Sequence, residues 1–515
     1  MKSSTLKTIS YTAMAAVMVI VPSLCAGQAL TGAPANPNYK YSTQMPPGVA
    51  SPDKVETRLG TLNFFDGFPD KATAEKLWDN LDFQRAVQSF LLALPAVSQA
   101  ANRNAFATLG PSNTVLPIYE QLTDSRSIIL TGNDNTVYSW VWLDLSKEPM
   151  VLEVPPKVLG TANDMWQRWV VDVGITGPDK GKGGKYLFLP PGYKGDVPEG
   201  DYYVVHSPTF SLWIPWRSFL VDGDPKPGVD LVKKFTKIYP LADAAKTRPP
   251  LKVVNMSGKP FNTVYPTDYH FWELLNQVVQ AEPSDSLDSV TLGFFQSIGI
   301  QKGKPFAPDE RMKKILTEAA AVGTATARNI LFHTRDKAAY YYSDSNWQLG
   351  FTGGYKFQTA PGVADFDAAT FYYYLAILVT PAMEEKMVGK GSQYAWTARD
   401  ANDNPLDGGK NYKLHLPPNV PVKDFWSVIL YSDQTRSMIQ TDQRFPGVSN
   451  QTKGLQVNAD GSIDVYFGPK APTGKENNWA QTVPGKGYNV VLRMYAALEP
   501  WFNKTWRPGE IEPQP

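Results

Sequence analysis

The side chains that could move a proton near neutral pH are few and widely spaced. The chain has four histidines, His206, His270, His333 and His415, and no two stand at metal-ligand spacing on one element. His206 precedes Ser207, but neighbouring side chains on a strand point to opposite faces, so this pair is not a Ser/His dyad by sequence alone. His206 and His415 are the candidate catalytic bases.

Asp134 is the third catalytic candidate. It stands in an Asn-Asp-Asn turn just before an aromatic strand, where β proteins often place ligands. The alternative is an Asx turn, in which the carboxylate only bonds its own backbone.

A second group of residues has the chemistry to bind an anion or a sugar. Arg217 ends the strand 211–216, and Arg493 shares a strand face with Tyr495. Tyr138 stands on the aromatic strand after Asp134, and Trp479 follows two asparagines in a loop. Arginine beside aromatic rings can hold a carboxylate or a hydroxyl cluster. The alternatives are buried ion pairs for the two arginines and core packing for Trp479.

Motifs for nucleotide and metal chemistry are absent or weak. No GxSxG, GxxxxGK[ST] or GxGxxG pattern occurs in the sequence. Asp400, Asp403 and Asp407 lie in a glycine-containing loop and could offer oxygens to calcium, but their spacing is not that of an EF-hand, and a plain turn is the simpler interpretation. We therefore expect no cofactor and no local metal site.

Composition favours a large β-rich globular protein. The 515 residues include 50 Lys+Arg and 49 Asp+Glu, and this near-neutral balance argues against a nucleic-acid-binding protein. The 43 prolines and 39 glycines favour many short strands over long helical bundles.

The N-terminus predicts export. Lys2 and Lys7 precede a short apolar run, 13–24, followed by small residues suited to cleavage, so residues 1–29 read as a signal peptide and the protein as periplasmic or secreted. The run is too short to span a bilayer. Cys25 leaves with the peptide, so the mature chain has no disulfide. Residues 30–58 are expected to form an extended arm that docks on a partner subunit, making a homo-oligomer.

Hydrophobic periodicity divides the remaining chain into a β domain with a leading helix (59–250), a helical connector (251–390) and a second β domain (391–515). The leading helix, 70–94, is expected to end at Pro95. The strand 136–145 puts valines and leucines on one face and Tyr138, Trp140 and Trp142 on the other, so both faces must be covered.

The connector is expected to hold three helices. One follows a cap at Thr267 or Asp268, and one begins near Pro308. Asp365 or Asp367 opens the third, which is nearly all apolar over 371–378. In the last domain a hairpin is expected between 455–457 and 463–467, around Asp460-Gly461. The predicted fold is mainly β with α, with two β-sandwich or jelly-roll-like domains joined by helices.

Two groups of short motifs carry a family resemblance. Asn133-Asp-Asn-Thr136, Leu143-Asp-Leu145, Asp172-Val-Gly174, Pro191-Gly-Tyr193 and Pro198-Glu-Gly200 resemble the bacterial domain of unknown function 1254. The strand 425–431, the turn 458–462, Asn478-Trp479, Pro484-Gly485 and Arg493-Met-Tyr495 resemble its usual partner, domain of unknown function 1214. The resemblance implies a secreted or periplasmic protein with two β domains joined through helices, the second similar to a jelly roll, and no established reaction.

Two functions remain open at this point. The first is a binding module for a glycan or a small amphiphilic or anionic molecule, without turnover. The second is a hydrolase or lyase acting between the domains, with a histidine base and Arg493 as anion anchor.

Overall fold

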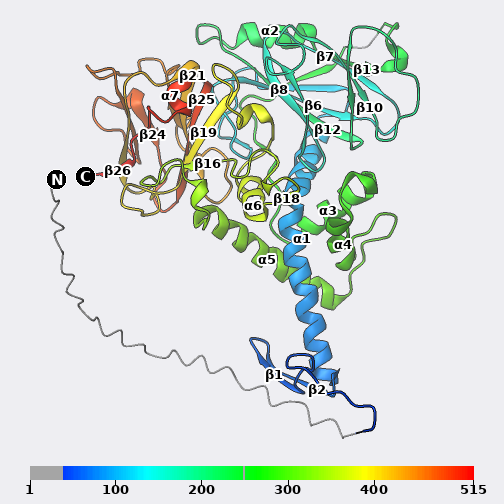
Figure 1. The fold of residues 1–515 in the computed structure, drawn as a ribbon. Helices are drawn as coiled ribbons and strands as arrows, with labels where there is room; N and C mark the ends of the chain where they lie inside the picture. Colours follow the sequence, from blue (N-terminus) through cyan, green and yellow to red (C-terminus); the bar gives the residue numbers. More distant parts are fainter. Residues whose placement is uncertain (1–38, 248–249) are drawn as a thin grey trace, which may run out of the picture. The chain divides into compact units, whose positions relative to one another are not determined.

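The computed structural model describes residues 39–247 and 250–515 (Figure 1). The predicted signal peptide and the start of the arm lie outside these residues. The chain divides into two compact units, residues 1–80 and 81–515. In the described residues no helix has the length and apolarity needed to cross a membrane.

The first unit contains a small antiparallel sheet of β1 (Lys54–Thr57), β2 (Gly60–Phe65) and β3 (Phe68–Pro69). The described part of the predicted arm before β1 is almost entirely exposed. Little of this unit is buried, since Leu62 is its one buried hydrophobic side chain among the described residues.

The long helix α1 (Lys71–Ala107) corrects one prediction, because it continues through Pro95 instead of ending there. Proline removes one backbone hydrogen bond and costs a helix interior roughly 3 kcal/mol. Ala96, Val97 and Ala100 after it are fully buried in the core. Their packing offsets the cost of the proline.

The second unit begins with two facing sheets. The six-stranded sheet contains, in order, β14 (Lys252–Asn255), β4 (Val115–Ile118), β6 (Val137–Asp144), β12 (Ser211–Ser218), β8 (Val158–Asp164) and β9 (Trp169–Gly174). The four-stranded sheet contains β11 (Tyr202–His206), β10 (Gly184–Leu189), β7 (Met150–Val154) and β13 (Lys237–Pro240). Both contribute side chains to one hydrophobic core. A two-stranded pair, β5 (Ser127–Ile128) and β15 (Phe261–Asn262), and α2 (Lys226–Phe235) complete this region.

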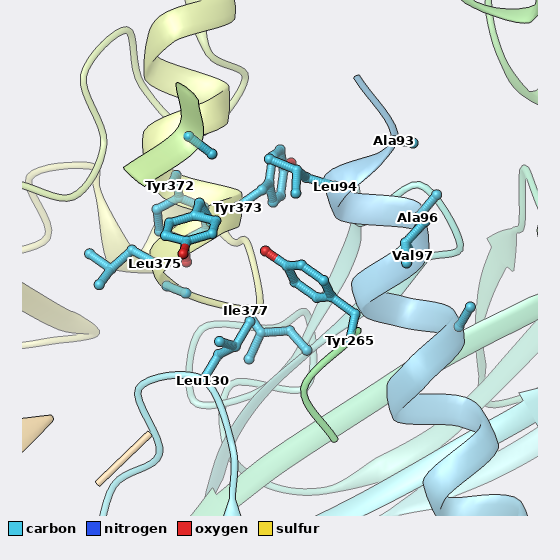
Figure 2. Packing of buried hydrophobic residues seen from close by; sticks show 14 of the residues in the cluster. Ala93, Leu94, Ala96, Val97, Leu130, Tyr265, Tyr372, Tyr373, Leu375 and Ile377 are labelled. Carbon is cyan, nitrogen blue, oxygen red and sulfur yellow. The ribbon is translucent and has the colours of Figure 1, made fainter. Parts of the chain in front are cut away.

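The two faces of β6 are covered by different cores, as its alternation predicts. Val137, Val141 and Leu143 pack in the core between the two sheets. Tyr138, Trp140 and Trp142 point into a larger central core that also contains residues of the helices and of the C-terminal region. Part of this central core, including Leu94, Tyr265 and Ile377, is seen in Figure 2.

The middle of the chain is helical, as predicted, but the described residues form four helices where the sequence predicts three. The helices are α3 (His270–Ala281), α4 (Ser289–Ser297), α5 (Glu310–Phe332) and α6 (Phe366–Leu375), and α4 is the additional one. The third predicted helix opens at Asp365, one of its two predicted caps, which accepts a hydrogen bond from the Ala368 amide. It ends at Leu375, before the predicted end. Short strands β16 (Gln348–Leu349), β17 (Gln358–Ala360) and β18 (Val363–Ala364) precede α6 in sequence.

The C-terminal region has a second pair of sheets around one core. The five-stranded sheet contains, in order, β16, β19 (Ser392–Thr397), β25 (Tyr488–Ala497), β21 (Val422–Ser432) and β22 (Gly447–Ser449). The four-stranded sheet contains β24 (Trp479–Gln481), β23 (Ile463–Gly468), β20 (Asn411–Leu416) and β26 (Ile511–Gln514). The short helix α7 (Glu499–Phe502) follows β25.

The predicted hairpin between 455–457 and 463–467 is wrong. Residues 455–457 form a loop, and β23 pairs instead with β20 and β24. The turn itself exists, because Asn458 and Ser462 share a backbone hydrogen bond around Gly461. A non-local partner for β23 buries more apolar surface than the short, half-exposed 455–457 segment could.

Candidate functional site

A cavity of about 100 Å³ lies in the second unit, lined by residues from both β regions and from the segment after α6. At ~10–15 Å³ per water, this is room for about seven to ten waters, or about ten non-hydrogen atoms of a ligand. Its walls are largely aromatic and apolar, and the side chains used below are Tyr138, Trp140, Trp213, Arg217, Tyr394 and Arg493. Leu130, Tyr372 and Ile377 also line it and are labelled in Figure 2.

Arg217 reaches the cavity from β12. It pairs in register with Tyr138 on β6, so the two side chains share a sheet face, and the guanidinium carbon lies 5.5 Å from the Tyr138 ring centre. Its Nη1 donates to the Tyr495 hydroxyl at 2.7 Å. Arg217 is 8% exposed.

Arg493 reaches the cavity from β25 in the other β region. Its register partner is Tyr394 on β19, and its guanidinium carbon lies 5.8 Å from that ring and 5.3 Å from the Tyr431 ring. Nη2 donates to the Thr131 carbonyl at 2.7 Å, whereas Nη1 is buried without a hydrogen-bond partner among the described residues. Arg493 is 3% exposed.

The segment that carries the Asn-Asp-Asn turn is held between these groups. Thr131 donates its amide to the Arg436 carbonyl, Gly132 accepts from the Tyr431 hydroxyl, and Asn133 donates to the Tyr495 hydroxyl. Thr131 has a positive φ of 45° although it is not glycine. Such strain persists only where surrounding contacts impose it.

Neither cavity arginine has an anionic partner. No carboxylate oxygen among the described residues lies within 4.0 Å of Arg217 or Arg493. Asp134 is close enough to Arg493 to interact with it, but burial raises the pKa of Asp134 to about 7 despite that attraction. Burial likewise raises the pKa of Tyr138, although the positive charges of both arginines oppose the rise. The tyrosines therefore stay neutral at physiological pH.

The structure brings together most of the ligand-binding candidates from the sequence. Arg217, Arg493, Tyr495 and Tyr138 lie in one cluster with Asp134. Trp479 is elsewhere on β24, half-buried, and its Nε1 donates to the Gly468 carbonyl.

The two candidate histidine bases lie apart from the cluster. His206 is exposed on the edge strand β11, and His415 on β20 is bonded to Asp464 at 2.8 Å. No histidine is among the cavity residues in the described chain. The roles predicted for His206 and His415 stay predictions.

The calcium candidates form a turn. Asp400 is buried, and its Oδ1 accepts hydrogen bonds from the amides of Asn402 and Asn404. Within the described ranges no group of three or more acidic, histidine or cysteine side chains could hold a metal ion.

Sequence reasoning missed Tyr394, Trp213 and Tyr431 as members of the site. The sequence held a weak signal for Tyr394, because Tyr394 and Trp396 stand two residues apart on a short strand and so share one face. Their proximity to Arg493 depends on the pairing of β19 with β25, which no local pattern reveals.

The fold and the site together define a β-rich protein with two β regions whose arginines meet in one aromatic cavity. Residues 112–240 match the protein of unknown function DUF1254, and residues 391–499 match the protein of unknown function DUF1214. The chain thus pairs these two families in the predicted order, with Arg217 in the first match and Arg493 in the second.

One solved structure has a similar fold. The crystal structure of the VPA0106 protein from Vibrio parahaemolyticus is 20% identical, with a TM-score of 0.53, and the match covers 84% of this chain and all of that one. A putative uncharacterized protein from Burkholderia cenocepacia is 12% identical, with a TM-score of 0.38, over 86% of this chain and 97% of that one. No curated protein matches this chain.

Proposed function

We propose that this protein binds a small anionic molecule with an apolar body in the Arg217–Arg493 cavity, without turnover. The observation that carries this proposal is the burial of two arginines, from two β regions, in one aromatic cavity without a carboxylate partner. A buried charge left unpaired is costly. An anionic ligand would supply the missing partner, while the aromatic walls would cover its apolar part.

Both arginines also connect the two β regions, through the Tyr495 hydroxyl and the Thr131 carbonyl. Those bonds account for one nitrogen of each guanidinium. They supply no negative charge, so an interface role alone leaves the positive charges uncompensated.

The enzyme alternative is favoured by one observation, the position of Asp134. A carboxyl group whose pKa lies near 7 beside an arginine suits general acid–base chemistry. Asp134 is not among the cavity-lining residues, however. Turnover is therefore the second candidate, and it predicts that a bound compound disappears on prolonged incubation.

The cellular setting is also a proposal. Export to the periplasm or beyond rests on the N-terminal sequence, and docking of the arm on a partner subunit rests on its composition. A jelly-roll-like arrangement of the C-terminal region is supported by its two sheets around one core.

The test is a thermal-shift screen of the full chain at fixed protein concentration against apolar carboxylates and phosphates, neutral sugars and divalent metals. A ligand that binds only the folded state raises the melting temperature. We expect shifts from the apolar anions, lost in Arg493→Gln and retained in the matched control Arg444→Gln, whose arginine lies outside the cavity. Shifts from neutral sugars or metals alone would overturn the proposal.

A further inference from the structure

The charges around the cavity allow its ligand to be specified further, in an inference that rests on the proposed function. A third buried arginine, Arg436, stands behind the Thr131 segment and is 2% exposed. Its guanidinium stacks 4.2 Å from the Tyr374 ring centre, and its Nε donates to the Tyr374 carbonyl. Like the other two arginines, it has no carboxylate oxygen within 4.0 Å among the described residues.

The groups facing the two cavity arginines cannot balance their charge. Tyr138, Tyr394, Tyr431 and Tyr495 contribute neutral rings and hydroxyl groups. Asp134 is the acid that interacts with Arg493, and its pKa of about 7 leaves it only partly ionised at neutral pH. Two full positive charges therefore face at most one negative charge.

The unsatisfied polar atoms of the cavity point to the same class of ligand. Among the described lining residues on the cavity side, the buried polar side-chain atoms without a hydrogen-bond partner are Nη1 of Arg493, Nε1 of Trp140 and Trp213, and Oγ1 of Thr176. All but the threonine hydroxyl can only donate. A ligand that satisfies them must be rich in acceptor oxygens, whereas a sugar would bring as many donors as acceptors.

We infer that the cavity selects a dianionic head group, of the phosphate monoester type, on a small aromatic or apolar body. Arg217 and Arg493 would each face part of the head group, and the free Nη1 of Arg493 would donate to one of its oxygens. While Asp134 is protonated, two charges on the ligand match the two guanidiniums. A monoanion of the same shape would leave one of them uncompensated.

The experiment compares two probes of nearly equal shape and different charge by titration calorimetry at pH 7 with the full chain, where Asp134 is only partly ionised. Phenyl phosphate is mostly dianionic there, because its second pKa is about 6, and phenyl sulfate has one negative charge. Phenyl glucoside is the neutral probe. We expect phenyl phosphate to bind at least tenfold more tightly than phenyl sulfate, and phenyl glucoside not to bind.

Variants then assign the discrimination to the arginines. Arg217→Gln and Arg493→Gln should each bring the phosphate-to-sulfate ratio close to one, and Arg444→Gln should leave it unchanged. If either glutamine variant fails to fold, the corresponding lysine variant, Arg217→Lys or Arg493→Lys, replaces it. Lysine retains the positive charge, so phenyl phosphate should still bind more tightly than phenyl sulfate. Binding of phenyl phosphate should be weaker than in the unchanged protein, because lysine lacks the planar fork of arginine.

The outcomes separate the two proposals. Equal binding of phosphate and sulfate would overturn the dianion inference and leave anion binding standing. Binding of the glucoside alone would overturn both. If none of the three probes binds while an apolar carboxylate shifts the melting temperature, the phosphate-type head group is wrong and the proposed function is retained.

Discussion

The arginines at Asp124 and those at the cavity differ in both burial and partner. At Asp124, which is 1% exposed, Arg126 and Arg444 both contact one carboxylate oxygen, at 3.1 and 3.0 Å. In the cavity, Arg217 and Arg493 are more deeply buried than those two arginines, yet they meet tyrosines and a backbone carbonyl instead of a carboxylate. Both clusters join the DUF1254 and DUF1214 regions, but only at Asp124 do the arginines contact a carboxylate.

Buried charged side chains in this chain usually have a partner of opposite charge. Glu282 faces Arg103, and Asp164 is bonded to Arg168. A structural contact explains these pairs without a ligand. Arg217, Arg493 and Arg436 depart from this pattern, and of these Arg217 and Arg493 line a cavity. We therefore assign binding at the cavity and not at Asp124.

The largest expected effect is the pH dependence that Asp134 gives to the free energy of unfolding. The pKa of Asp134 is about 7 in the folded protein, whereas an unperturbed aspartate has a pKa of 3.8. Between about pH 4 and pH 7 the folded protein therefore binds the Asp134 proton more tightly than the unfolded chain does. Stability is therefore expected to fall as pH rises from about 4 to 7, by up to about 4 kcal/mol, and to be flat above.

Urea denaturation across that pH range measures the effect, with Asp134→Asn as the comparison. The variant should lose most of the slope and retain the smaller one from Asp433, whose pKa burial raises to about 6. Identical pH profiles for the two proteins would show that Asp134 is ionised like a surface carboxylate.

The second prediction concerns the Asp124 cluster. Asp124→Asn removes the buried carboxylate that accepts hydrogen bonds from Arg126 and Arg444, and we expect a loss of about 2 kcal/mol in the free energy of unfolding. Urea denaturation at pH 8 and constant salt measures it. A loss below about 0.5 kcal/mol would mean that the half-exposed arginines are satisfied by solvent and that the pair is not structural.

The matching change in the cavity should cost much less. Arg493→Gln removes an uncompensated buried charge together with one hydrogen bond, so the ligand-free protein should change in stability by no more than about 1 kcal/mol. The same denaturation assay compares it with Asp124→Asn. A loss as large as that of Asp124→Asn would indicate that Arg493 is a structural pair and would weaken the binding assignment.

The smallest effect is expected at a residue outside both regions. His206→Ala, on the exposed edge strand β11, should change stability by less than about 0.5 kcal/mol and leave probe binding unchanged. Calorimetry with phenyl phosphate tests this. A clear loss of affinity would instead support the histidine-dependent alternative.

Local sequence patterns predicted much of the fold. The alternation in 137–144 identified both faces of β6, and the apolar spacing in 310–332 identified the buried side of α5. Prediction failed where packing overrode local signals. Pro95 does not end α1 because the following turns are buried, and 455–457 does not pair with β23 because β20 offers a better partner.

For the site, the sequence by itself determined the residue types: arginine and tyrosine alternating along strands, and an Asn-Asp-Asn turn before an aromatic strand. It could not tell that Arg217 and Arg493, far apart in the chain, lie against one cavity, nor that the carboxylates elsewhere leave them unpaired. Strand periodicity is a local property, whereas register, sheet order and charge pairing depend on contacts between distant residues. Only the tertiary structure therefore decided which arginines contact a carboxylate and which line the cavity without one.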